Sequence, residues 1–250
     1  MKTAACCIIG DEILSGKTKD TNSHYLAKTL FDLGIELKCI RVIGDDAQDI
    51  IRTVKELSLL YDIVFTSGGI GPTHDDITYE SIATAYNLEM KVDQTTFNMI
   101  MKYGNKNYTL TEEYARHLAT FPFPAILLRE NKKLMIPVVV VNENIYILPG
   151  IPALFQLLLD TLGSRLSQNT PYYRLEIATE QPEMAIATIL RKIQQQVQHV
   201  VKIGSYPTWQ QEEEKIKVIV TVTGQDKSKV KEISQWIQKE IRGWPHRSRL

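Results

Sequence analysis

The first 90 residues alternate between short apolar runs and segments in which apolar residues recur every three or four positions. The run at 4–9 is continuous, as expected of a strand that is buried on both faces of a parallel sheet, and 37–43 and 62–66 are the second and third expected strands. The segments between them place their apolar side chains on one face of a helix. This alternation predicts an α/β fold with a mostly parallel central sheet and helices on both of its faces.

Residues that favour helix N-termini precede two of the helical segments. Asp20 or Thr21 is placed to cap the first helix, and Asp46 is placed to cap the second. Asp45 and Asp46 also follow the second strand directly. A purely structural role as caps is therefore an alternative to any chemical role for these two carboxylates.

The pattern beyond residue 88 predicts mainly helix, followed by a hairpin. We expect helical structure through 89–123, with a separate piece at 111–119. The runs at 137–141 and 145–148 predict a β-hairpin. Pro152 is well placed in the first turn of a further helix.

The character of the sequence changes near Gln168, where the polar segment 164–171 is typical of a linker. We therefore expect a large α/β domain at 1–167 and a small α+β domain at 168–250. The elements expected in the small domain are a strand at 173–177, a helix at 182–197, a loop at 202–207, a strand at 215–222 and a helix at 227–242.

The charge of the chain is balanced, with 29 Lys and Arg against 29 Asp and Glu. A net charge of zero argues against a general nucleic-acid or membrane-surface binder. No apolar run reaches the roughly 18 residues of a membrane span, and the first residues are not typical of a signal peptide. We expect neither a nucleic acid nor a membrane as a partner.

The chain has three cysteines, two of which are adjacent. Cys6 and Cys7 lie in the first predicted strand, so their side chains should point to opposite faces of the sheet. We expect both to be buried, reduced thiols. Such thiols indicate a reducing compartment, the cytoplasm and also the nucleus.

A glycine-rich segment at 66–78 joins the third predicted strand to the next helix. Gly68, Gly69 and Gly71 lack side chains where the backbone turns sharply or a ligand comes close. The helix that follows would present free N–H groups to an anion. The segment therefore predicts a phosphate site, and a glycine-rich turn with an aspartate cap is the plain alternative.

Acidic residues accompany glycines in the loops after all three strands, at 10–12, 44–46 and 68–76. Loops at the carboxyl ends of parallel strands meet at one edge of the sheet. A phosphate with carboxylates beside it indicates a divalent metal between them, such as Mg²⁺, Mn²⁺ or Co²⁺. The expected metal ligands are Asp76 and Asp45, supported by Asp75, Asp46, Asp11 and Glu12.

A second strand-to-helix turn contains Pro149 and Gly150 and is another candidate phosphate site. Here too a plain turn before a helix is an alternative. The hydroxyl groups of Ser67, Thr73 and Thr78 are expected to donate further hydrogen bonds to a bound phosphate.

Several ordered motifs resemble the molybdopterin-binding fold that the MogA and MoaB proteins share with the N-terminal domain of the CinA family. These motifs are Gly10-Asp11-Glu12-Ile13-Leu14-Ser15-Gly16, Asp20-Thr21-Asn22, Gly44-Asp45-Asp46, residues 66–78 and Leu148-Pro149-Gly150-Ile151-Pro152. His74 and the segment Gly204-Ser205-Tyr206-Pro207 are similar to the related domains that are fused to eukaryotic FAD synthases.

This resemblance implies a three-layer α/β core with a mixed central sheet. It also implies one of two activities. CinA-type domains hydrolyse the diphosphate of FAD or ADP-ribose with a divalent metal and release AMP, whereas MogA and MoaB bind and adenylylate molybdopterin. A pterin- or nucleotide-binding module without turnover is a third reading. Relatives are often oligomers, so we expect a dimer or trimer.

For diphosphate hydrolysis we expect Asp76, Asp75, His74 and Asp45 to be catalytic. One of these carboxylates, or His74, would act as the general base on a water molecule. No amidase or FAD-synthase domain follows within the 250 residues, so we expect the hydrolase module alone. The sequence does not choose among FAD, ADP-ribose and a pterin as the ligand.

Overall fold

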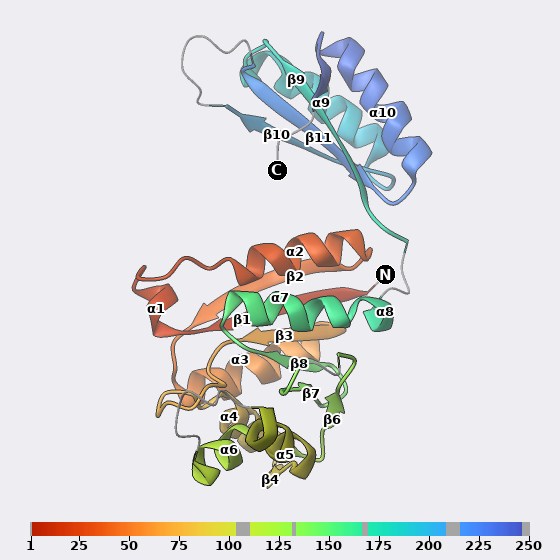
Figure 1. The fold of residues 1–250 in the computed structure, drawn as a ribbon. Helices are drawn as coiled ribbons and strands as arrows, with labels where there is room; N and C mark the ends of the chain where they lie inside the picture. Colours follow the sequence, from red (N-terminus) through yellow and green to blue (C-terminus); the bar gives the residue numbers. More distant parts are fainter. Residues whose placement is uncertain (1, 104–110, 132–133, 167–169, 209–215, 247–250) are drawn as a thin grey trace. The chain divides into compact units, whose positions relative to one another are not determined.

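The structure is a computed structural model that describes residues 2–103, 111–131, 134–166, 170–208 and 216–246. The chain divides into two compact units, Met1–Asn169 and Thr170–Leu250 (Figure 1). The expected domain boundary between 167 and 168 lies outside the described residues. Within the described residues, no helix is long and apolar enough to cross a membrane.

A six-stranded mixed sheet forms the centre of the first unit, in the order β2-β1-β3-β8-β7-β6. The parallel strands are β1 (Thr3–Ile9), β2 (Glu36–Ile43), β3 (Ile63–Ser67) and β8 (Ile145–Leu148). β7 (Val138–Val141) pairs antiparallel with β8 and with the edge strand β6 (Ile126–Leu128). The expected mostly parallel sheet is confirmed, and the expected hairpin is formed by β7 and β8.

Helices cover both faces of this sheet, which confirms the three-layer arrangement (Figure 1). α2 (Asn22–Asp32) and α7 (Pro152–Thr161) pack on one face. α3 (Ala47–Leu60) and α4 (Thr78–Ala85) pack on the other. A one-turn helix, α1 (Asp11–Leu14), forms directly after β1.

β1 separates the two hydrophobic cores, because its side chains alternate between them. Cys6 belongs to the core under α2 and α7, and Cys7 belongs to the core under α3 and α4. Both cysteines are free and buried, as expected. Burial raises the pKa of the Cys7 thiol to about 12, so this thiol stays protonated and serves as a core residue.

The expectation of helix throughout 89–123 is wrong at both ends. β4 (Glu89–Val92) and β5 (Thr120–Phe123) form a two-stranded antiparallel sheet around α5 (Gln94–Tyr103) and α6 (Glu112–Leu118). β5 is fixed by packing with α4, since the rings of Phe121 and Tyr79 meet edge to face at 5.3 Å. Such a short strand depends on tertiary contacts, which the local pattern does not contain.

The expected linker at 164–171 is helical at its start, because α8 (Gly163–Leu166) continues from α7. Leu162 and Leu166 are both buried in the core under α7, so their side chains hold this turn against the sheet. Residues 167–169 lie outside the described residues.

The second unit has a four-stranded antiparallel sheet in the order β10-β11-β9-β12. The expected loop at 202–207 is wrong: these residues form the edge strand β10, paired along its length with β11. Gly204 and Pro207 are poor strand formers, but an edge position tolerates both. The elements are β9 (Tyr173–Thr179), α9 (Glu183–Val197), β10 (Lys202–Pro207), β11 (Val218–Gly224), α10 (Lys227–Glu240) and β12 (Trp244–His246).

This order of elements is the split β-α-β arrangement, in which two helices pack on one face of a four-stranded sheet. Its core contains Ile186 of α9, Val220 of β11 and Ile233 of α10. The expected small α+β domain is confirmed. Lys215, where the strand at 215–222 was expected to begin, lies outside the described residues.

The turn between β7 and β8 is tied to the end of α3 by the side chain of Asn144. Its Oδ1 accepts a hydrogen bond from the Ser58 hydroxyl at 2.8 Å, and its Nδ2 donates to the carbonyls of Ser58 and Tyr61 at 3.0 and 3.2 Å. Asn144 is half-buried. If its side chain were removed, water could therefore replace these hydrogen bonds only in part.

We predict that Asn144→Ala lowers the free energy of unfolding by about 1–3 kcal/mol, because the half-buried groups of Ser58 and Tyr61 lose their hydrogen bonds. Urea unfolding would measure the change. The matched control is Asn98→Ala on the exposed face of α5, where alanine favours the helix and no loss of stability is expected. Equal stability of the two variants would contradict the prediction.

Candidate functional site

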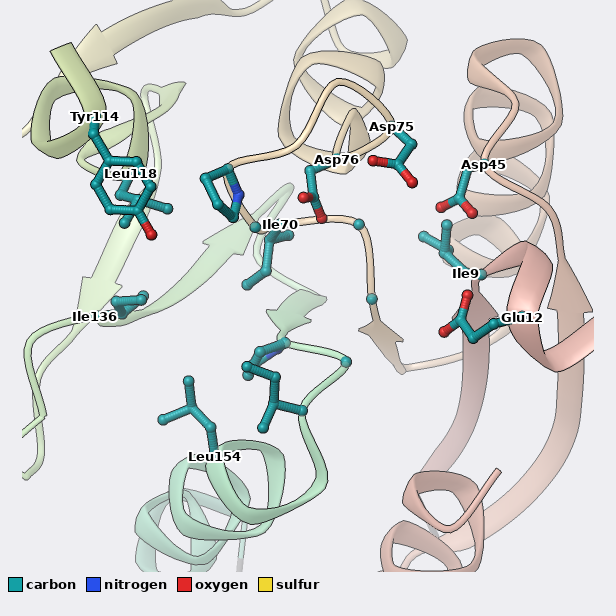
Figure 2. Close-up of a pocket in the computed structure, with 18 residues that line it drawn as sticks. Ile9, Glu12, Asp45, Ile70, Asp75, Asp76, Tyr114, Leu118, Ile136 and Leu154 are labelled. Carbon is teal, nitrogen blue, oxygen red and sulfur yellow. The ribbon is translucent and has the colours of Figure 1, made fainter. Parts of the chain in front are cut away.

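At the carboxyl edge of the first sheet, the loops after β1, β2, β3 and β8 line one cavity of about 530 Å³. This volume is in the usual range for small-molecule sites, roughly 300–1,000 Å³. Figure 2 shows the labelled side chains around it. The expected site residues that line the cavity are Glu12, Asp45, Gly68, Gly69, Gly71, Asp75, Asp76, Pro149 and Gly150.

The backbone is packed most closely at Gly68. This residue has a φ of +114°, and a Cβ atom there would lie 2.0 Å from the carbonyl oxygen of Ile9. A Cβ atom on Gly150 would lie 3.3 Å from the Cα of Gly68. The Gly68 N–H donates to the Leu148 carbonyl at 3.2 Å. The ends of β1, β3 and β8 therefore meet only if residue 68 is glycine. This packing explains Gly68 whether or not a phosphate binds to the loop.

Thr78 closes the glycine loop. Its N–H donates to the carbonyl of Gly69 at 2.9 Å, and its hydroxyl donates to the carbonyl of Gly68 at 3.0 Å. Thr78 is fully buried and does not line the cavity. Its side chain thus holds the loop from inside the protein.

Asn22, the first residue of α2, joins two of the turns that line the cavity. Its Nδ2 donates to the Ser67 hydroxyl at 3.0 Å and to the Gly150 carbonyl at 2.8 Å. Ser67 is buried and donates in turn to the Pro149 carbonyl at 3.2 Å. The sequence suggested Ser67 as a phosphate donor and did not identify Asn22 as its partner. Asp20 serves as the expected cap, because it accepts the Ser23 N–H at 3.0 Å.

The adjacent residues Asp45 and Asp46 occupy different environments. Asp46 caps α3 by accepting the Asp49 N–H at 2.9 Å, and it does not line the cavity. Asp45 lines the cavity and accepts the Asp11 N–H at 2.9 Å. The side chain of Asp11 lies against Gly44, outside the cavity lining. Of the neighbouring carboxylates Asp45 and Asp46, only that of Asp45 is therefore available to a ligand in the cavity.

The electrostatic environment of Asp45 is negative. Burial raises the pKa of Asp45, and its hydrogen bond from the Asp11 N–H opposes that rise. The charges of Asp11, Glu12 and Asp75 raise the pKa of Asp45 further. This side of the cavity thus gathers anionic groups that repel one another.

Thr73 orients the carboxylate of Asp76 in the glycine loop. Its N–H and its hydroxyl donate to Oδ2 of Asp76 at 2.8 and 2.5 Å. The polar side chain of Thr73, and after it the backbone N–H of Asp75 itself, lower the pKa of Asp75, so Asp75 stays ionised. Thr73 itself and His74 do not line the cavity, and 99% of the His74 side chain is exposed.

The carboxylate side fits a divalent cation by ligand type. Within the described residues, however, no three Asp, Glu, His or Cys side chains lie close enough together to hold a metal ion. Mg²⁺ commonly takes one or two carboxylates and completes its shell with phosphate and water oxygens. The carboxylates lining the cavity therefore fit a metal that a phosphate ligand helps to hold: Glu12, Asp45, Asp75 and Asp76.

The opposite side of the cavity is apolar, and the sequence did not reveal most of it. Its residues come from α6, from the segment before β7 and from the start of α7, so no spacing in the sequence links them. Apolar residues on a short helix give the same signal as core residues. The lining residues that were missed are Tyr114, Leu118, Ile136, Ile151 and Leu154.

Comparison with known families supports the resemblance that the motifs suggested. Residues 5–168 match the family described as the probable molybdopterin binding domain. The chain belongs to this family. Residues 171–245 match the family described as the FAD synthase middle domain, so the expected link to FAD synthases is confirmed as well.

Two similar proteins match this chain over most of its length. A probable FAD synthase of Caenorhabditis elegans is 37% identical over 228 residues, which cover 82% of this chain and 44% of that protein. The corresponding protein of Caenorhabditis briggsae is 36% identical over 228 residues, which are 82% of this chain and 43% of that protein. The chain thus spans less than half of these relatives.

A solved structure supports the fold of the molybdopterin-binding domain. The protein CinA of unknown function from Thermoplasma acidophilum has a TM-score of 0.58 and 28% identity. The match covers 66% of this chain and 98% of the CinA chain. The first unit is therefore built like a CinA chain over nearly that chain's whole length.

We predict that Gly68→Ala lowers the free energy of unfolding by at least about 2 kcal/mol, because a positive φ and a clash with the Ile9 carbonyl both oppose a Cβ atom. Thermal or urea unfolding of the variant would measure this change. Gly163→Ala is the matched control, since a Cβ atom there meets nothing within 4 Å. A Gly68→Ala protein as stable as this control would show that the loop relaxes freely.

Proposed function

We propose that the molybdopterin-binding domain of this chain is a metal-dependent hydrolase of a nucleotide diphosphate, with FAD or ADP-ribose as the substrate and AMP as one product. The observation that carries the proposal is that carboxylates from three loops, one of which is the glycine loop, line one cavity. The similarity to FAD synthases supports the choice of a nucleotide.

The concentration of negative charge favours a metal-dependent reaction over simple anion binding. A diphosphate would be repelled by Glu12, Asp45, Asp75 and Asp76, whose carboxylates share the cavity. A bound divalent ion would supply positive charge against both the carboxylates and the phosphate oxygens. A binding protein for an anion would gain nothing from these carboxylates without such an ion.

The chain's own residues would then bind and orient the substrate. Backbone N–H groups of the glycine loop would hold one phosphate, and the turn at Pro149 and Gly150 would limit its movement. The attacking water would lose its proton to a carboxylate of the cavity as its oxygen bonds to phosphorus and the P–O bond of the bridge breaks. Asp75 suits this role better than His74, since His74 does not line the cavity.

A pterin-handling function is the second candidate, and the family match favours it directly. In that case the apolar side of the cavity would hold the pterin ring, and ATP would supply an adenylyl group. Binding of a nucleotide or pterin without turnover belongs to the same alternative. A dimeric or trimeric state and a cytoplasmic or nuclear location stay predictions.

We predict that Asp45→Asn lowers kcat/KM for AMP release at least about 100-fold, as losses of groups that act on transition-state charge commonly do. Asparagine still accepts the Asp11 N–H, so the loop should keep its shape. The assay follows AMP by chromatography with FAD and ADP-ribose, each with Mg²⁺, Mn²⁺ or Co²⁺.

Asp46→Asn is the matched control, because it changes the neighbouring carboxylate and can still cap α3. Its activity should stay near that of the unaltered chain. Equal activity of both variants would remove Asp45 from the mechanism. Absence of AMP with every metal, together with ATP-dependent adenylylation of molybdopterin, would establish the second candidate.

A further inference from the structure

The cavity of the first unit has two chemically distinct sides. Figure 2 shows Asp45, Glu12, Asp75 and Asp76 on one side, with Tyr114, Leu118 and Ile136 on the other. Ile70 of the glycine loop lies between the two groups. A ligand that fills the whole cavity must therefore combine a strongly polar part with an apolar part.

α6 contributes Tyr114 and Leu118 to the apolar side, and its two faces make different contacts. Ala115 is buried against Ile100 of α5, which fixes the helix to its neighbour. Tyr114, His117 and Leu118 stand at positions i, i+3 and i+4, so they share another face. This face is turned toward the cavity, because Tyr114 and Leu118 both line it.

α6 also contacts the glycine loop. Nε2 of His117 lies 3.3 Å from the carbonyl oxygen of Gly71. The N-terminus of the helix is capped by Thr111, whose hydroxyl oxygen accepts the Tyr114 N–H at 3.2 Å. The position of Tyr114 is thus set relative to the loop that we propose as the phosphate site.

Tyr114 is not needed by the hydrophobic cores. It belongs to none of the core clusters formed by the described residues, and 40% of its surface is exposed. A large aromatic side chain that lines a cavity and supports no core is available for stacking with a ligand ring.

We infer that Tyr114, Leu118 and Ile136 form the binding surface for a planar aromatic ring of a nucleotide, such as flavin or adenine. The inference rests on the proposed function, because the proposed phosphate site at the glycine loop sets the direction of the ligand. With a phosphate at that loop, the ring extends toward α6 and away from the carboxylates. Tyr114 is then a specificity-determining residue, which favours nucleotides over sugar phosphates without a ring.

The test is equilibrium binding of three phosphates to the full chain with Mg²⁺: FMN, AMP and ribose 5-phosphate. FMN binding is followed by flavin fluorescence, and the other two by calorimetry. We expect FMN and AMP to bind and ribose 5-phosphate to bind much more weakly. Tyr114→Ala should weaken FMN and AMP binding at least about fivefold, as loss of an aromatic stacking partner does.

Two further variants distinguish stacking from a general disturbance of the fold. Tyr114→Phe keeps the ring and should retain the affinity for FMN. Tyr103→Ala removes an exposed tyrosine of α5 that does not line the cavity, and it should bind FMN like the unaltered chain. Unchanged FMN and AMP affinity in Tyr114→Ala, or no binding of either nucleotide, would overturn the inference.

Turnover of FAD and of ADP-ribose, measured in parallel with each of the three metals, separates this inference from the proposed hydrolase. Tyr114-dependent binding of FMN without AMP release from either substrate would disprove the hydrolase and support the ring site. AMP release with the same KM in Tyr114→Ala as in the unaltered chain would support the hydrolase and overturn the ring site.

Discussion

The first unit depends on the contact between backbones at the carboxyl edge of its sheet. Gly68 lies against the carbonyl of Ile9 and beside Gly150, so the ends of β1, β3 and β8 approach more closely than side chains would allow. Asn22 joins two of these ends with buried hydrogen bonds. Main-chain contacts therefore form the floor of the cavity, and they hold the loops in fixed positions relative to one another before a ligand binds.

Charge is distributed very unevenly around this floor. The whole chain carries no net charge, yet burial and then the nearby carboxylates of Asp11, Glu12 and Asp75 raise the pKa of Asp45. Such an arrangement has a cost in the free protein, because like charges repel at short range. The metal ion of the proposed function would relieve this repulsion, because an opposite charge favours the ionised form of a carboxylate.

Sequence patterns predicted the parallel strands and the meeting of their loops, because buried strands and glycine turns are encoded locally. They did not separate Asp45 from its neighbour Asp46, since both follow β2 and only the three-dimensional path shows which one caps α3. They also missed β4 and β5, which depend on packing against α4, and β10, whose glycine and proline are typical of loops. Tyr114 could not be found from the sequence, because its partners in the cavity come from distant segments.

The floor and the apolar wall of the cavity differ in how well they tolerate amino-acid substitution. Its floor consists of backbone contacts that leave no room for a new side chain at Gly68. Part of its apolar wall, Tyr114 and Leu118, belongs to α6, which lies with α5 between β4 and β5 in the segment that joins α4 to β6. If the proposed ring and phosphate sites hold, a protein engineer could redesign this segment to accept a different ring while the backbone floor stays intact, and ligand choice could then be changed separately from the chemistry.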